Sequence, residues 1–181
     1  ELTRRLSRHK VWKDRNGELW SPTEYWPGTT RAAEHVLALG AFVLDMDAAG
    51  GWHPYVDTWR GEGLAFGIYT TFHHTPEAPR WRAYFPLVTP VPAPEWPVVW
   101  TRLAWGLARR LADPKCKDPC RCYWLPSCPP GNEGMTFAAS YDGVTYGTLR
   151  DSAGGEVTVT TPVANDCVTL DPAKFYGVRF L

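Results

Sequence analysis

The chain has 181 residues, 44% of them hydrophobic and 21% charged, and its formal net charge is zero. This length suffices for one domain with a sizeable core, so we expect a single domain over residues 1–181. The balanced charge argues against a uniformly basic nucleic-acid coat, and no apolar run reaches the roughly 20 residues that a membrane span needs. The chain begins with Glu1 rather than Met, so we expect a piece of a longer protein.

Helix and strand signals alternate in the first half of the chain. A helix is predicted over residues 30–39, with a threonine at its start and a glycine just after its end. An apolar strand at 42–47 follows, and the Trp-rich stretch at 52–59 is predicted to be a loop. Residues 64–74 and 80–87 have the composition and alternation of two further strands.

The second half combines one long helix with short strands. The helix is indicated by apolar residues that recur every four positions. We expect residues 132–181 to pack on the same domain, which gives an α/β (α+β) fold class. The elements predicted in this half are a helix at 95–111, strands at 121–125, 156–161 and 166–170, and a hairpin turn at 142–143.

Two acids end the first apolar strand, in the sequence FVLDMD at residues 42–47. Because side chains alternate between the faces of a strand, Asp45 and Asp47 point the same way, about 6.5 Å apart between Cα atoms. Two carboxylates on one face repel each other, and oxygen ligands of this kind suit Mg²⁺ or Mn²⁺. The pair predicts a divalent-metal site that acts on phosphates. The alternative is a turn in which each Asp bonds its own backbone.

A histidine and two arginines mark the next two predicted strands. His73 and His74 face opposite sides of a strand, so one of them can serve a given site. Arg80 and Arg82 share a face of the following strand. Beside a metal, these donors suit a triphosphate, because arginine binds phosphate with two prongs. Taken singly, an ordinary core or surface position is the favoured interpretation of each of these residues.

A third acid, Asp113, directly follows the predicted long helix. The helix dipole disfavours an acid at that end, which suggests a use outside the helix. The alternative is a turn-forming Asp before Pro114.

Four of the five cysteines lie close together, in the spacing C-x3-C-x-C-x5-C. This spacing lacks the paired C-x2-C of a usual zinc ribbon. We expect ordinary reduced thiols and a cytoplasmic location, with a structural zinc as the less favoured alternative. The four residues are Cys116, Cys120, Cys122 and Cys128.

The order of these motifs resembles the archaeo-eukaryotic primase superfamily, and more closely the primase–polymerase domains of plasmids, phages and other mobile elements. The matching strings are LDMD, TTFHHTPEAPRWRAYFPL and LADPKCKDPCRCYWLPSCPPG, preceded by GELWSPTEYWPGTTR. The resemblance covers roughly residues 10–131. It implies a catalytic core with an RNA-recognition-motif-like mixed sheet flanked by helices, and with the metal-binding acids at strand ends.

The resemblance also implies DNA primase and polymerase activity, a template-directed nucleotidyl transfer from nucleoside triphosphates. Asp45, Asp47 and Asp113 would be the catalytic residues and would hold two divalent ions, Mg²⁺ or Mn²⁺. We therefore expect alanine at Asp45 or Asp47 to abolish primer synthesis while the fold survives. The implied nucleotide-binding residues are His74, Arg82, Arg80 and Arg121.

Several points stay open at this stage. The family usually has a small residue beside its histidine, so His73 remains an alternative to His74. The expected partners are a single-stranded DNA template and nucleoside triphosphates, with a helicase or accessory primase segment in the full-length protein and no membrane. A nucleotide-sugar transferase using Mn²⁺ and a non-catalytic nucleic-acid-binding module are the competing hypotheses. A haloacid-dehalogenase-type phosphatase is disfavoured, because Ala49 stands where that class has threonine.

Overall fold

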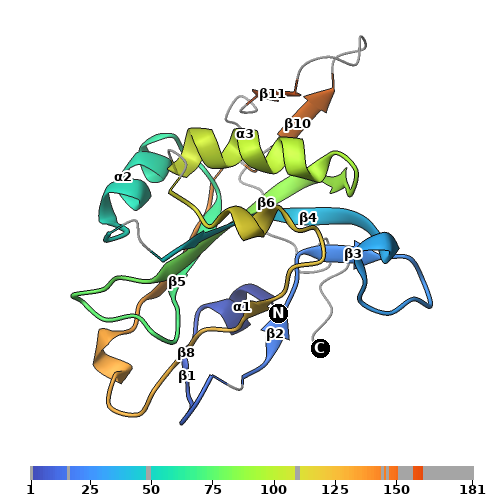
Figure 1. Cartoon of the computed structure of the whole chain (residues 1–181). Coiled ribbons are helices and arrows are strands. Elements are labelled where there is room, and N and C mark those ends of the chain that lie inside the picture. The colour runs from blue at the N-terminus through green and yellow to red at the C-terminus, as the bar shows by residue number, and fades with distance from the viewer. Residues whose placement is uncertain are drawn as a thin grey trace.

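An antiparallel sheet of five strands forms the centre of the computed structural model, which describes residues 2–15, 17–47, 50–108, 111–143, 145, 147–150 and 157–160. Helices α2 (His53–Gly61) and α3 (Trp96–Ala108) lie on one face, and α1 (Leu2–Leu6) lies on the other (Figure 1). This arrangement confirms the predicted mixed α and β class. The strand order is β3 (Thr23–Tyr25), β4 (Val36–Met46), β6 (Trp81–Pro92), β5 (Phe66–Thr70) and β9 (Ala138–Tyr141).

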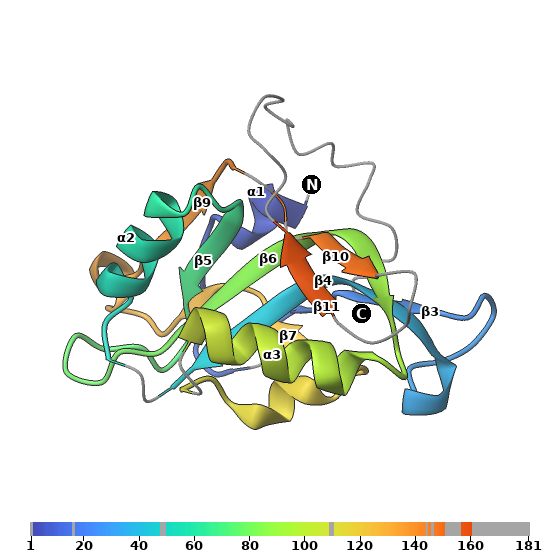
Figure 2. The same ribbon diagram turned by 90° about the horizontal axis from the view of Figure 1, so that it is seen from above.

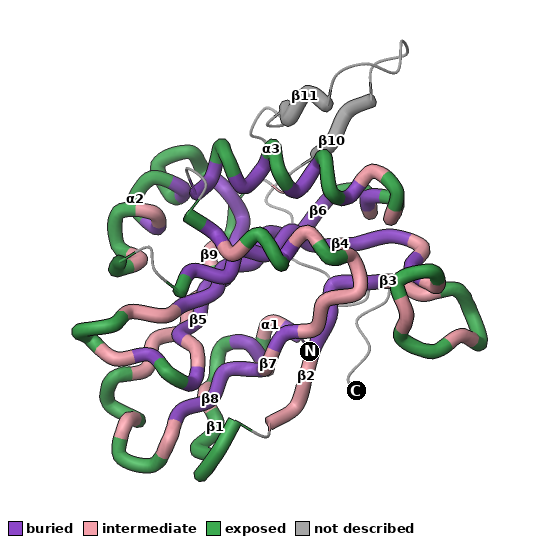
Figure 3. Tube along the Cα trace, viewed as in Figure 1, coloured by how far each residue is buried: buried purple, intermediate pink, exposed green. Residues whose placement is uncertain are grey.

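The long pair β4 and β6 is the buried spine of the sheet. Residues 41–46 of β4 and 81–87 of β6 are buried throughout, because elements cover both faces (Figure 3). Strands covered on both faces have largely continuous apolar sequences, and these two buried segments are apolar apart from Asp45 and Arg82. The antiparallel register places Asp45 opposite Arg82 and Met46 opposite Trp81.

Aromatic side chains fill the layer between the sheet and the two upper helices. The predicted long helix is confirmed as α3, which crosses over β4 and β6 (Figure 2). Its buried Trp96 and Trp100 pack against Phe42 of β4. Trp59 of α2 meets the ring of Phe85 edge to face, with centroids 4.9 Å apart. Large rings of this kind contribute much of the buried apolar area in a domain of this size.

The elements predicted at 30–39 and 52–59 are wrong, and tertiary packing explains both. The helix expected at 30–39 is a short 3₁₀ turn, η1 (Ala33–His35), followed by the start of β4 at Val36. The run that looked helical pairs with β3 and β6, and non-local pairing overrides a weak local propensity. The loop expected at 52–59 is α2, which has a proline in its first turn and buries Val56 and Trp59.

The strands predicted at 64–74, 80–87, 121–125 and 156–161 form, with different lengths. The strands expected at 64–74 and 80–87 are β5 and the longer β6. The hairpin expected at 142–143 is wrong, because β9 pairs with β5, whereas β10 (Gly147–Arg150) pairs with β11 (Val157–Thr160). The strand expected at 166–170 lies outside the described residues. No helix in the described part of the chain is long and apolar enough to cross a membrane.

A second, smaller layer covers the lower face of the sheet. β1 (Lys10–Val11) runs parallel to β8 (Ser127–Cys128), and β2 (Leu19–Trp20) pairs antiparallel with β7 (Tyr123–Trp124). β7 is the short strand predicted near residues 121–125. Trp20 joins this layer to the sheet, because its indole N–H donates to the Tyr69 hydroxyl at 2.9 Å.

The outer edge of β4 beyond Leu39 is covered by α3 and the chain that follows it. β3 pairs with β4 only as far as Leu39, so that in the described part of the chain the outward carbonyls of the later residues have no strand partner. The Trp100 indole donates to the Val43 carbonyl at 3.1 Å, and the Asp113 N–H donates to the Asp45 carbonyl at 2.9 Å. The chain after α3 is therefore held against the last residues of β4, and buried carbonyl groups gain the partners they require.

We expect Gly67→Ala to lower the free energy of unfolding by about 1–3 kcal/mol. Gly67 lies opposite Tyr84, and a Cβ at Gly67 would overlap the buried Tyr84 ring, which also contacts Trp20. Urea unfolding of the purified chain measures the change. The matched control is Gly106→Ala on α3, where a Cβ meets nothing within 4 Å and stability should rise by up to about 1 kcal/mol. Equal effects of the two substitutions would contradict the proposed close packing.

Candidate functional site

A buried ion pair between Asp45 and Arg82 joins the two central strands. Arg82 Nη2 donates to Asp45 Oδ2 at 2.7 Å, and the two side chains are 4% and 7% exposed, respectively. Arg82 Nη1 also donates to the Tyr69 hydroxyl at 3.1 Å and to the Trp124 carbonyl at 3.3 Å. Its guanidinium lies 4.8 Å from the ring centroid of Tyr123. Contacts with Asp45, Tyr69, Trp124 and Tyr123 thus restrict the Arg82 side chain.

The surroundings keep the Arg82 side chain charged. Burial by itself acts to lower the pKa of Arg82, but Tyr69 and Asp45 beside it outweigh burial and raise that pKa well above its ordinary value. Burial raises the pKa of both Tyr69 and Tyr123. The two phenols are therefore neutral hydrogen-bonding groups near pH 7, and the Asp45 carboxylate is the counter-charge of the arginine.

Asp113 lies next to Asp45 although 68 positions separate them in the chain. It stands just before the 3₁₀ turn η2 (Pro114–Lys117), and its Oδ1 accepts from the Lys115 N–H at 2.9 Å. The turn-forming role weighed from the sequence is therefore real. Its Oδ2 lies 3.0 Å from Arg121 Nη2, which is also 3.5 Å from Asp45 Oδ2. One guanidinium nitrogen thus lies between the two carboxylates.

Asp47 and Arg80 form a second, outer pair. Both residues come just beyond the ends of the paired strands, where continuation of the Asp45–Arg82 register would place them opposite each other. Arg80 Nη1 lies 3.8 Å from Asp47 Oδ2, and the side chains are 40% and 53% exposed, respectively. Strand alternation predicted that the two acids share one face and the two arginines another, and the pairing of Asp45 with Arg82 and of Asp47 with Arg80 agrees with this. The structure places Asp47 at the rim, in solvent.

The two histidines have different environments. His73 is exposed, whereas His74 is buried, and its Nδ1 accepts from the Arg80 N–H at 3.1 Å. Burial lowers the pKa of His74, so its imidazole is neutral near pH 7. The structure thus places His74, rather than His73, in contact with the backbone of Arg80.

A third histidine, His9, was missed by the sequence analysis. Its Nε2 lies 2.8 Å from the Thr70 carbonyl at the end of β5. Burial lowers the pKa of His9, and its electrostatic interaction with His74 acts in the same direction. No local pattern distinguishes His9 from the basic residues around it, because its burial depends on where α1 packs.

The acids can be tested for their fit to a metal ion. Asp45 and Asp113 already share one cationic nitrogen, and Asp45 Oδ1 is buried without a hydrogen-bond partner among the residues that the structure describes. Two hard oxygen ligands and one unpaired oxygen fit a single divalent cation in place of that nitrogen. Among the described residues, however, no group of three or more His, Cys, Asp or Glu side chains is arranged to hold a metal. An arrangement of all three acids around two ions therefore stays a prediction.

The four clustered cysteines carry free thiols. Cys116 and Cys128 are buried, whereas Cys120 and Cys122 are partly exposed. Burial raises the pKa of Cys116 to about 11, so this thiol stays protonated. In the described part of the chain, no three of the cysteines gather at a possible zinc position.

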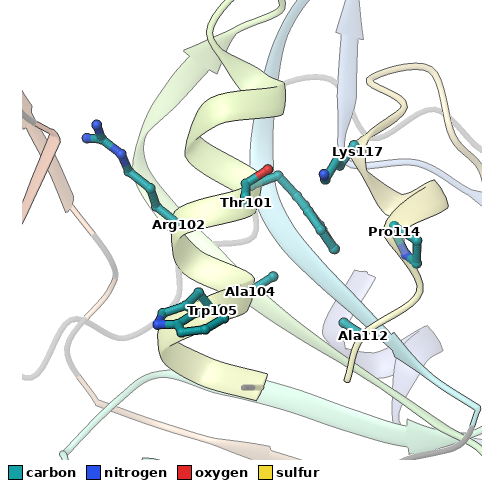
Figure 4. A pocket seen from close by; sticks show the side chains of 8 residues that line it. Thr101, Arg102, Ala104, Trp105, Ala112, Pro114 and Lys117 are labelled. Carbon is teal, nitrogen blue, oxygen red and sulfur yellow. The ribbon is translucent and has the colours of Figure 1, made fainter. Parts of the chain in front are cut away.

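A separate groove lies between α3 and η2 (Figure 4). It has a volume of about 670 Å³, and its lining mixes aromatic and cationic side chains. Its floor includes the two neighbours of Asp113 in the chain, but none of the three acids lines it. The lining residues are Trp100, Thr101, Arg102, Ala104, Trp105, Ala112, Pro114 and Lys117.

Comparison with known proteins gives one similar solved structure. No protein-family model matches the chain, and no curated protein matches it. The solved AEP domain of the cyanophage S-2L Primase-Polymerase (PrimPol) shares 21% sequence identity with it, with a TM-score of 0.42. The match covers 62% of this chain and 57% of the phage chain, which is less than two thirds of that chain's length. The assignment of site residues rests on the geometry described above.

We expect Asp45→Asn to lower the free energy of unfolding by about 3–5 kcal/mol, because it leaves the Arg82 guanidinium buried without its counter-charge. The structure thus revises the expectation that alanine at Asp45 spares the fold. Asp47→Asn, at an exposed position, is the control and should change stability by less than about 0.5 kcal/mol. Urea unfolding at pH 7 checks both values. Comparable effects of the two substitutions would refute a structural role for the inner pair.

Proposed function

We propose that this chain is a primase–polymerase catalytic domain, a nucleotidyltransferase that adds nucleotides from nucleoside triphosphates to a strand paired with a DNA template. One observation carries the proposal: acids from two motifs far apart in the sequence, Asp45 and Asp113, meet at a single cationic nitrogen. The middle motif contributes Arg82 and Arg80 to the same strand ends. Convergence of three separate motifs on one place is typical of an active site and uncommon among unrelated surface residues.

The residues of the site have separable roles. Asp45 and Asp113 would hold a divalent cation, which when bound would neutralise charge on the reacting phosphates. Arg80 is 40% exposed at the rim and is suited to bind a triphosphate oxygen. Arg82 was predicted to contact the triphosphate as well, but its burial favours a positioning role in which it orients the Asp45 carboxylate. His74 would position Arg80 through its backbone bond to that residue.

A basic groove at the N-terminus supports a nucleic-acid partner. It has a volume of about 350 Å³ and lies beside residues 125–126, which directly follow β7. β7 also carries the Trp124 carbonyl that holds Arg82, so the groove and the acid site border the same short strand. Closely spaced cations attract the phosphates of a single strand. The lining residues are Arg4, Arg5, Arg8, His9, Lys10, Leu125 and Pro126.

One observation favours a second candidate, a nucleic-acid-binding module without catalysis. Each of the three acids has an arginine within 4 Å, so the cluster is charge-balanced without a metal ion. A structural cluster of ion pairs would have the same appearance. The two candidates differ in one measurable property, which is metal-dependent incorporation of nucleotides.

We expect the wild-type chain to extend a primed DNA template in the presence of Mn²⁺ and deoxynucleotides, and Asp113→Asn to reduce the rate about 100-fold or more, because a carboxylate of the cation site is lost. Gel analysis of labelled primers measures the rate, and thermal melting confirms that the variant is folded. Asp57→Asn, at an exposed site on α2, is the control with the same chemical change. DNA binding by the wild type without any extension would favour the second candidate.

Binding of single-stranded DNA should weaken steeply as salt concentration rises, because phosphate contacts release counterions. If Arg8 contacts one phosphate, Arg8→Ala should reduce the slope of log K against log salt by about 0.7. Fluorescence anisotropy with a labelled oligonucleotide between 50 and 200 mM salt, a range of roughly fourfold, measures the slope. Arg102→Ala, on α3 across the sheet, is the control and should leave the slope unchanged. A slope that neither substitution alters would exclude the basic groove from the binding path.

A further inference from the structure

Arg121 occupies the position at which the proposed site would hold its cation. Its Nη2 lies 3.0 Å from Asp113 Oδ2 and 3.5 Å from Asp45 Oδ2. The three residues come from the end of β4, the chain after α3 and the segment before β7. Two carboxylates this close need a positive charge between them, and in this structure the charge is a guanidinium.

The two arginines that contact Asp45 are held very differently. Arg82 is 4% exposed and is bonded to Asp45, Tyr69 and the Trp124 carbonyl. Arg121 is 23% exposed, and its contacts include the two acids and the ring of Tyr123, 5.7 Å from its centroid. Moving Arg82 would leave several buried groups unpaired, whereas the partly exposed Arg121 can turn toward solvent at far lower cost.

We infer that Arg121 is a latch that competes with the divalent cation for Asp45 and Asp113. In the metal-free protein the Arg121 guanidinium bridges the two carboxylates, and together with Arg82 it balances their two negative charges. When a cation binds, the same oxygens turn to it, and the like charge drives Arg121 out of the site. This inference rests on the proposed function, because it assumes that the two acids bind a metal.

Competition of this kind has a measurable signature. The apparent dissociation constant for the ion is the intrinsic constant divided by the fraction of molecules in which the acids are open. Removal of the latch should therefore tighten metal binding, whereas removal of an ordinary structural residue would weaken it or leave it unchanged. A gain in affinity is also not what a damaged fold would produce.

Mn²⁺ binding to the purified chain, without nucleotide, tests the inference. Electron paramagnetic resonance of free Mn²⁺ yields the dissociation constant. We expect Arg121→Gln to lower it by about fivefold, the effect of losing one partly exposed ion pair. Arg102→Gln removes the same charge from an exposed position on α3 and should leave the constant unchanged. A constant in Arg121→Gln equal to or higher than that of the wild type would overturn the latch.

A second measurement uses the wild-type protein and needs no variant to fold. Phenylglyoxal modifies accessible arginines, and mass spectrometry reports the extent at each position. We expect Mn²⁺ to raise the modification of Arg121 several-fold, with buried Arg82 unreactive and exposed Arg102 reactive in both states. If Arg121 only repelled the ion and stayed in place, Arg121→Gln would still bind Mn²⁺ more tightly. Mn²⁺ would then not raise the modification of Arg121 in the wild type. Unchanged reactivity would therefore overturn the release of Arg121.

The outcomes separate this inference from the proposed function. If the wild type binds Mn²⁺, and Asp113→Asn weakens that binding, but Arg121 affects neither measurement, the metal site stands and the latch fails. If neither the wild type nor Arg121→Gln binds Mn²⁺, the proposed metal site fails and the latch fails with it.

Discussion

The Asp45–Arg82 pair is the interaction on which the rest of this structure depends. A charged group buried in a protein interior is tolerated only when it is paired and hydrogen-bonded, and here Arg82 Nη2 donates to Asp45 Oδ2 at 2.7 Å. Within the described part of the chain, Asp45 Oδ1 and Arg82 Nε are buried without a hydrogen-bond partner. The pair links β4 to β6, and the other guanidinium nitrogen reaches Tyr69 of β5 and the Trp124 carbonyl of β7. One arginine therefore connects three strands of the sheet to the layer beneath them.

The covering of a strand edge explains how a distant acid reaches the site. Beyond Leu39, β4 has β6 on one side and, among the described residues, no strand on the other. The chain after α3 closes this edge, and the backbone bond from Asp113 to Asp45 is part of that closure. An exposed edge is a liability that proteins cover with other segments. The same contact that protects the edge also brings a second carboxylate to the candidate site.

The three arginines form a series from buried to exposed. Arg82 is almost fully enclosed, Arg121 is 23% exposed, and Arg80 is 40% exposed. We expect their freedom to move to increase in the same order, because more of each successive side chain is surrounded by solvent instead of protein. The roles that we propose differ accordingly: Arg82 would orient an acid, Arg121 would exchange with a cation, and Arg80 would face an incoming phosphate. The sequence alone does not show how deeply each of these arginines is buried.

The sequence by itself determined the features that depend on local spacing. Strand alternation grouped Asp45 with Asp47 and Arg80 with Arg82, and a four-residue repeat located α3. Local spacing failed at residues 30–39, where pairing with β3 and β6 converts an apparent helix into a strand. Only the tertiary structure decided that Asp45 faces Arg82, that Asp113 lies against Asp45, and that Arg121 lies between these two acids. The contacts of Asp45 join residues 37 to 76 positions apart, and their geometry follows from strand register and edge packing, which no short window of sequence contains.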